Sequence, residues 1–136
     1  VLLRPSGTEP KAKIYTEVLV DVDEIEDVPK VRQKAKRAAI DLAHAFCTDM
    51  LSRIGLVLPK WTMEINDLVS IEDKIHWSQN IVPMLIQKVD VDPEEATTWL
   101  QEQLGPEAIS LLKPGIIKLI EDENINDDKL LACFDS

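Results

Sequence analysis

The chain has 136 residues, of which 45% are hydrophobic and 29% charged, and this composition is typical of a soluble globular protein. Its formal net charge of −10 is unevenly distributed, because residues 1–60 carry +1 and residues 61–136 carry −11. This acidity argues against nucleic acid and anionic membranes as partners, since both require a basic surface. The asymmetry predicts two modules, at residues 1–56 and 57–136.

Three further expectations come from the start of the chain, from its cysteines and from its apolar runs. A strand-like segment already begins at Val1, so we expect the chain to be part of a longer polypeptide. Cys47 and Cys133 lack the spacing of a disulfide framework or a metal site, which favours a reducing, cytoplasmic compartment. No apolar run reaches the length of a membrane span, so no membrane association is expected.

The segment RPSGTEPK at residues 4–11 has the composition of a phosphate-binding loop. Arg4 offers a planar guanidinium to two phosphate oxygens, and the hydroxyls of Ser6 and Thr8 can donate hydrogen bonds. Gly7 permits the positive φ that lets successive backbone N–H groups converge on one anion. The plainer alternative is a tight turn between two prolines that binds no ligand.

A strand and a long helix are expected after this loop. Apolar residues alternate with polar ones along residues 11–22, which predicts a half-buried strand. Pro29 suits the first turn of a helix that continues to about residue 54, and Gly55 is its expected end. Two strands alone do not form a stable sheet. We therefore expect further strands, either upstream of Val1 or within residues 56–69.

Residues 57–136 are expected to be all-helical. Ser70 is a candidate N-cap, and Pro83 is expected to kink or split the helix that follows. The run DPEE at residues 92–95 is a strong helix start, with the aspartate as N-cap and the proline at the first position. Trp61, Trp77 and Trp99 are expected to anchor the core of this module.

Further stop and start signals divide the end of the chain. Gly105 is expected to end one helix and Pro106 to open the next. The pair Pro114-Gly115 is expected to break that helix, and Asn126 to cap a last one. Several short helices separated by such signals are typical of a compact helical module.

The loop and its flanking strands resemble the C-terminal, fourth domain of the α-D-phosphohexomutases, a family that includes the phosphoglucomutases and phosphomannomutases. RPSGTEPK resembles the family's phosphate loop along all eight residues, and Lys13-Ile14-Tyr15 follows it as in the family. The resemblance covers residues 1 to about 54, whereas the helical remainder resembles no family. It implies an α+β fold of strand, loop, strand and helix, with the topology of the TATA-binding protein.

The resemblance also implies a function. Members of the family transfer a phosphoryl group between hydroxyls of a hexose phosphate, using a phosphoserine and magnesium that upstream domains hold. The corresponding motifs do not occur in this sequence, so the chain is expected to hold no catalytic residue and no metal, and to be inactive by itself. Here the resemblance implies that Arg4, Ser6, Gly7 and Thr8 contact the phosphate that is not transferred. Lys13 would add positive charge. The implied partners are a hexose phosphate and upstream domains of the same polypeptide.

The acidic helical half leaves a second function open, that of a protein-interaction or oligomerisation module without catalysis. His44 and His76 have no cysteine or second histidine at ligand spacing, so neither predicts a metal site. The acidic runs at residues 21–24 and 121–123 lack the spaced oxygen ligands and the glycine of a calcium loop. We expect them to be solvated loop charges.

Overall fold

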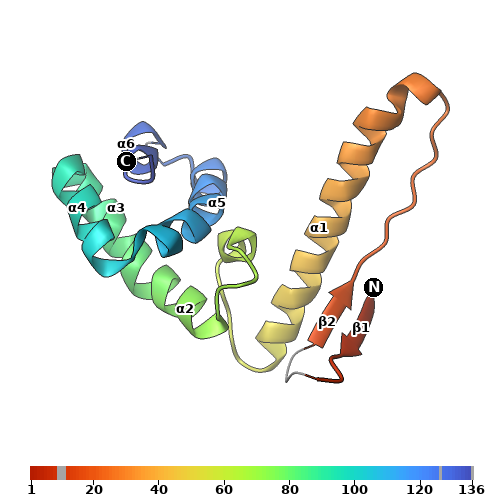
Figure 1. The fold of residues 1–136 in the computed structure, drawn as a ribbon, viewed down its shortest axis with the longest axis horizontal. Helices are drawn as coiled ribbons and strands as arrows, with labels where there is room; N and C mark the ends of the chain where they lie inside the picture. Colours follow the sequence, from red (N-terminus) through yellow and green to blue (C-terminus); the bar gives the residue numbers. More distant parts are fainter. Residues whose placement is uncertain (9–11, 126, 136) are drawn as a thin grey trace. The chain divides into compact units, whose positions relative to one another are not determined.

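The computed structural model describes residues 1–8, 12–125 and 127–135, and the chain divides into two units, Val1–Val57 and Leu58–Ser136. It is mostly helical with one small antiparallel sheet, so its class is broadly α+β (Figure 1). Across the described ranges, none of the helices combines the length and the apolar character that crossing a bilayer requires.

The first unit consists of a two-stranded sheet and one long helix. Its elements are β1 (Leu2–Pro5), β2 (Ala12–Tyr15), the 3-10 turn η1 (Ile25–Asp27) and α1 (Val28–Arg53). The two strands are antiparallel, with Leu3 opposite Ile14 and Arg4 opposite Lys13. Ile14 is half-buried, whereas Leu3 opposite it and Lys13 are exposed, so the face of the hairpin that carries Ile14 is partly covered and the other faces solvent.

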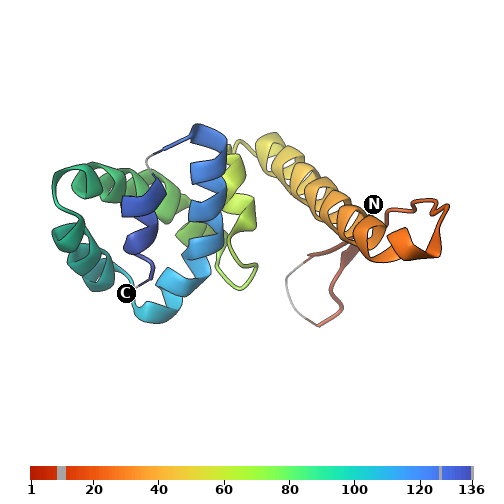
Figure 2. The same cartoon turned by 90° about the horizontal axis from the view of Figure 1, so that it is seen from above.

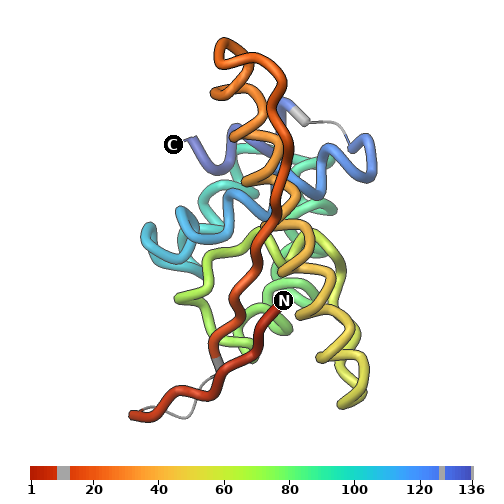
Figure 3. The backbone as a smooth tube through the Cα atoms, turned by 90° about the vertical axis from the view of Figure 1, so that its right-hand side faces the viewer, coloured from red at the N-terminus to blue at the C-terminus, as the bar shows by residue number. Residues whose placement is uncertain are grey.

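The second strand is shorter than predicted. It ends at Tyr15, although the strand was expected over residues 11–22. Residues 16–22 continue as an extended segment that runs alongside α1 (Figure 3). They leave the sheet because β1 is only four residues long, and no other described strand lies opposite them. The hydroxyl of Thr16 donates a hydrogen bond of 3.0 Å to the carbonyl oxygen of Ala39, which attaches this segment to α1.

Both ends of α1 follow the local signals in the sequence. Pro29 lies in its first turn, as predicted. At the other end Gly55 has a φ of 82°, and its N–H donates to the carbonyl of Ser52 over 3.0 Å. The N–H of Leu56 donates to the carbonyl of Leu51 over 2.9 Å. These two bonds form a Schellman motif, which requires a residue that tolerates positive φ and confirms Gly55 as the stop.

The second unit is all-helical within the residues that the structure describes, as predicted. Its elements are the 3-10 helix η2 (Lys60–Glu64), α2 (Ile71–His76), the π-helical turn η3 (Trp77–Ile81), α3 (Val82–Val91), α4 (Pro93–Gln103), α5 (Pro106–Glu123) and α6 (Asp127–Ala132). Figure 2 shows α6 among the helices α3, α4 and α5, all of which it contacts. Residues 56–69 contain no strand, so they do not extend the sheet. Asn126, the expected cap of α6, lies outside the described residues.

One apolar core holds the helices of this unit together. All its buried members lie at or beyond Trp61, and several side chains are fully enclosed: Leu85, Ala96, Leu100, Leu112 and Ile116. Trp61 and Trp77 are buried in this core and Trp99 packs against it, as expected of anchors. By contrast, no described residue of the first unit is buried. The core of the protein therefore belongs to the second unit.

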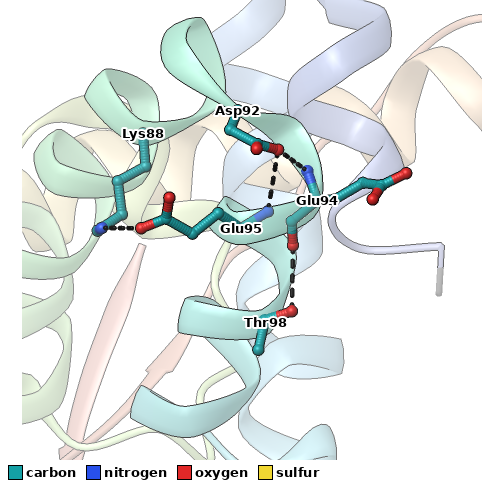
Figure 4. A network of polar contacts seen from close by, with 5 residues as sticks. All are labelled: Lys88, Asp92, Glu94, Glu95 and Thr98. Atoms are coloured by element: carbon teal, nitrogen blue, oxygen red, sulfur yellow. Dashed lines mark hydrogen bonds and ion pairs between the residues drawn. The ribbon is translucent and has the colours of Figure 1, made fainter.

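Two N-caps predicted from the sequence are confirmed. The hydroxyl oxygen of Ser70 accepts a hydrogen bond of 3.1 Å from the N–H of Asp73 at the start of α2. The carboxylate of Asp92 accepts bonds of 2.9 Å and 3.2 Å from the N–H groups of Glu94 and Glu95 at the start of α4 (Figure 4). Each cap satisfies N–H groups that have no partner inside the helix.

Pro83 neither kinks nor splits the helix in the expected way, because a π-helical turn precedes it. The chain stays helical from residue 71 to residue 91 through α2, η3 and α3. In the wide turn of η3, the N–H of Val82 donates to the carbonyl of Trp77, five residues earlier. Pro83 has no N–H to donate, and this change of hydrogen-bond spacing accommodates it within a continuous helix.

The expected break at Pro114-Gly115 is wrong, since α5 runs through both residues. Pro114 removes the N–H that would bond to the carbonyl of Ser110. Ser110 and Pro114 are both exposed, so water can satisfy the Ser110 carbonyl. Pro106 opens α5 as predicted, and Gly105 is the N-cap of α5, since α4 ends before it.

Candidate phosphate-binding loop

The hairpin brings together the two cationic residues predicted for the phosphate site. Arg4 lies near the end of β1 and Lys13 near the start of β2, and the register sets them directly opposite each other. Their neighbours Leu3 and Ile14 share the other face, since successive residues on a strand point to opposite sides. Arg4 and Lys13 are both exposed, on the solvent face of the hairpin beside the loop.

Two like charges at a directly paired position repel each other. Residues opposite one another in an antiparallel ladder have Cβ atoms about 5 Å apart, and like charges there are destabilising. Neither Arg4 nor Lys13 forms an ion pair with a residue that the structure describes. A bound anion would relieve this repulsion, so the pair favours a negatively charged ligand.

The remaining predicted ligands lie in the loop itself. Ser6 is half-buried, and Gly7 and Thr8 are exposed in a bend of the chain. The hydroxyls of Ser6 and Thr8 make no hydrogen bond with any described group, which leaves both to bond a ligand. Glu9, which was expected to shape the loop, lies outside the described residues.

Gly7 permits a positive φ but does not adopt one in this structure. Among the glycines, only Gly55 has its φ in the left-handed region. A Cβ atom at Gly7 would have no described heavy atom within 4 Å, so there is free space on the side where a side chain would lie. Without a left-handed residue at position 7, the described part of the loop, residues 6–8, does not form the converging set of N–H groups of an anion nest. Binding would therefore depend on the side chains of Arg4, Ser6, Thr8 and Lys13.

A second basic region lies at the start of α1. A shallow hollow there is lined by Asp27, Lys30, Val31 and Lys34. It combines a carboxylate with two ammonium groups and an apolar side chain, so its charge does not select an anion as clearly as the Arg4–Lys13 pair does. The sequence predicted a solvated basic helix face here, and Lys30 and Lys34 are indeed exposed.

The sequence named Arg4 and Lys13 as separate ligands but missed that they are paired across the two strands. The signal was present in the loop length, because a hairpin register follows from the number of residues between its strands. Comparisons with known proteins contribute no relative: no family model, no curated protein and no solved structure matches this chain. The properties of the loop thus rest on its own residues.

Proposed function

We propose that this chain is the C-terminal part of a phosphohexomutase, in which the loop binds the phosphate of a hexose phosphate that is not transferred. The observation that supports this proposal is the RPSGTEPK segment between two antiparallel strands, with Arg4 directly opposite Lys13. A phosphate dianion matches two adjacent cations flanked by free hydroxyls of Ser6 and Thr8 in charge and in hydrogen bonding. Like the family, the full enzyme would be α+β in this domain and cytoplasmic.

The role of the loop is to position the substrate. A phosphate held at one end of the sugar fixes the distance and orientation of the hydroxyl that reacts at the other end. Binding energy from this distant group supports the reaction without any chemistry at the loop. The phosphoserine and the magnesium ion belong to upstream domains, so we expect the chain alone to bind phosphate weakly and to catalyse nothing.

The test is an NMR titration of the chain with glucose 1-phosphate, mannose 1-phosphate and inorganic phosphate. We expect saturable shifts of the Ser6, Gly7 and Thr8 amides at millimolar ligand, with similar shifts for all three ligands. The Arg4→Ala variant is expected to lose these shifts, and Arg4→Lys to keep the charge but bind less tightly, because lysine has no planar fork.

The matched control is Lys36→Ala, which removes an exposed cation of α1 from the same unit. It is expected to leave the titration unchanged, so a general effect of net charge would be recognised. Loop amides that do not move at millimolar ligand, or an Arg4→Ala variant that binds like the parent chain, would contradict the proposal.

A second candidate function, a protein-interaction or oligomerisation module, is favoured by the separate core of residues 58–136. This unit carries most of the acidic side chains of the chain, and its core does not require residues 1–57. Sedimentation of the whole chain and of residues 58–136 alone tests this function. A concentration-dependent dimer that residues 58–136 also form would support it, whereas a whole chain that stays monomeric would count against self-association.

A further inference from the structure

Residues 17–22 have the pattern of a β-strand but lack the partner that a strand needs. The segment is extended beside α1 (Figures 1 and 3), and no described strand pairs with it. Apolar side chains alternate along it, with Val18 half-buried and Leu19 87% exposed. Val20 and Val22 are 49% and 41% exposed, on the same side of the alternation as Val18. Because no described strand pairs with this segment, one of its edges has no strand to form ladder hydrogen bonds with.

The register of the hairpin shows where a partner would lie. Leu2 is opposite Tyr15 and Leu3 is opposite Ile14, so each step back along β1 is one step forward along β2. On this register Val1 lies opposite Thr16. A strand that continued the line of β1 beyond Val1 would thus run antiparallel to residues 17–22, residue for residue.

We infer that residues 17–22 are a docking site for a six-residue extended segment that continues the line of β1 and completes its ladder with β2. The site is continuous with the β1–β2 ladder that the structure already contains. The inference rests on the proposed function for one point only, the source of the segment, which is the upstream part of the same polypeptide.

The faces of the ladder specify the chemistry of this segment. Positions opposite Val18, Val20 and Val22 lie on the side of the partly covered face of the hairpin, beside three valines, so apolar and preferably β-branched side chains fit there. Positions opposite Glu17 and Asp21 face solvent beside a carboxylate, so lysine or arginine fits there. The expected segment alternates apolar and basic or neutral polar residues.

The experiment adds the segment Val-Lys-Val-Thr-Val-Lys directly before Val1 of the complete chain. This order puts valine opposite Val18, Val20 and Val22, and lysine opposite Glu17 and Asp21. The measurement is the rate of amide hydrogen exchange of residues 17–22, detected by NMR. We expect alternate amides of this segment to exchange at least about tenfold more slowly than in the chain without the extension, because they become ladder donors.

Two control extensions test whether the pairing is specific. Gly-Ser-Gly-Ser-Gly-Ser has the same length without strand propensity, and it is expected to give no protection. The strand segment with one extra serine before Val1 shifts the register by one residue and turns its valines to the solvent face, so protection is expected to disappear.

Unchanged exchange with the strand extension would overturn the inference, and equal protection with the shifted extension would overturn its register. The outcome can be distinguished from that of the phosphate titration, which reports on the amides of residues 6–8. Slowed amides at residues 17–22 together with a loop that does not bind phosphate would leave this inference standing and contradict only the proposed function.

Discussion

Gly115 lies within α5, where this helix packs against η2. A Cβ atom at this position would lie 2.8 Å from Cγ1 of Ile65 and 3.2 Å from the carbonyl oxygen of Trp61. Both distances are shorter than ordinary van der Waals contact, and Ile65 is almost completely buried. The missing side chain at Gly115 is therefore what allows η2 to approach α5.

We expect Gly115→Ala to destabilise the helical unit by up to about 2 kcal/mol. Alanine would improve helix propensity by about 1 kcal/mol, but overpacking a buried contact costs about 1–3 kcal/mol. The second effect is expected to prevail, because the carbonyl of Trp61 is part of the backbone and Ile65 has little room to move. The measurement is the free energy of unfolding, obtained from a urea titration that is monitored by tryptophan fluorescence.

The matched control for this substitution is Gly105→Ala. A Cβ atom at Gly105 would have no heavy atom within 4 Å, and the φ of Gly105 is −64°, which any residue adopts. Because alanine is a poorer N-cap than glycine, a loss below about 1 kcal/mol is expected. A Gly115→Ala variant as stable as the parent chain would show that η2 moves away from α5 at little cost.

Lys74 shows at the same scale what the sequence did not predict. Its polar neighbours in the sequence suggest a solvated lysine, yet it is 5% exposed, and its Nζ donates a hydrogen bond of 3.1 Å to the carbonyl of Ile65. Nζ is also 3.9 Å from Oδ1 of Asp67. The position of η2 relative to α2 determines this burial, and that position depends on tertiary packing. Local sequence patterns do not contain it.

At the scale of elements, the start of α4 depends on a few short-range contacts (Figure 4). Asp92 caps two N–H groups, and the hydroxyl of Thr98 donates to the carbonyl of Glu94 over 3.1 Å. Nζ of Lys88 lies 3.3 Å from a carboxylate oxygen of Glu95 and 5.7 Å from the ring centre of Trp99. Since the pair of Lys88 and Glu95 is largely exposed, it contributes little, and the cap is the stronger contact.

We therefore expect Asp92→Ala to lower the free energy of unfolding of the helical unit by about 1 kcal/mol. Asp92→Ser keeps a side-chain oxygen that can accept from the same N–H groups, so it is expected to retain most of this stability. Urea titration followed by circular dichroism at 222 nm measures both variants. Asp90→Ala is the control, because Asp90 is exposed near the end of α3 and caps nothing. Equal losses for Asp92→Ala and Asp90→Ala would contradict a role for the cap.

Helix ends were predictable because their signals act locally. Ser70, Asp92 and Gly55 satisfy backbone groups within three or four residues, so their roles can be recognised in a short window of sequence. The interior of a helix was harder to predict. Pro83 and Pro114 remain inside continuous helices, since the tertiary packing of the surrounding segments outweighs the cost of one lost hydrogen bond.

At the scale of the whole molecule, the two units differ in how much apolar surface they bury. The core cluster lies wholly beyond residue 60, whereas residues 1–57 hold twelve of the seventeen large hydrophobic side chains that are exposed among the described residues. The net charges of +1 and −11 predicted two modules from the sequence. The alternation along residues 11–22 did not reveal the short β2, because the length of a strand depends on its partner.

In the candidate site, too, the properties of single side chains could be predicted, whereas those that depend on backbone conformation or strand pairing could not. The residue types in RPSGTEPK could be used to predict an anion site, because their donors and charges are properties of single side chains. The φ of Gly7 could not be predicted, since glycine permits a left-handed conformation but does not impose it. The orientation of the Arg4–Lys13 pair required knowledge of the register and of which face of the hairpin is exposed to solvent.

We expect residues 58–136 to fold alone and residues 1–57 to remain largely unfolded alone. The helical unit keeps its whole core after separation, and about 80 residues suffice for a marginally stable domain. The isolated first unit would have a two-stranded sheet and one helix without a buried side chain, and such a sheet is marginal at best in water. The two segments would be compared by circular dichroism during urea titration, with the whole chain as reference.

A cooperative transition is expected for residues 58–136, at nearly the same urea concentration as the main transition of the whole chain. Residues 1–57 are expected to show a gradual loss of signal, since a helix whose apolar stripe is not fully covered frays without a defined midpoint. Cooperative unfolding of residues 1–57 would mean that α1 and the hairpin stabilise each other sufficiently, and a docked further strand would then be unnecessary for folding. Loss of structure in residues 58–136 would instead mean that the helical core depends on the first unit.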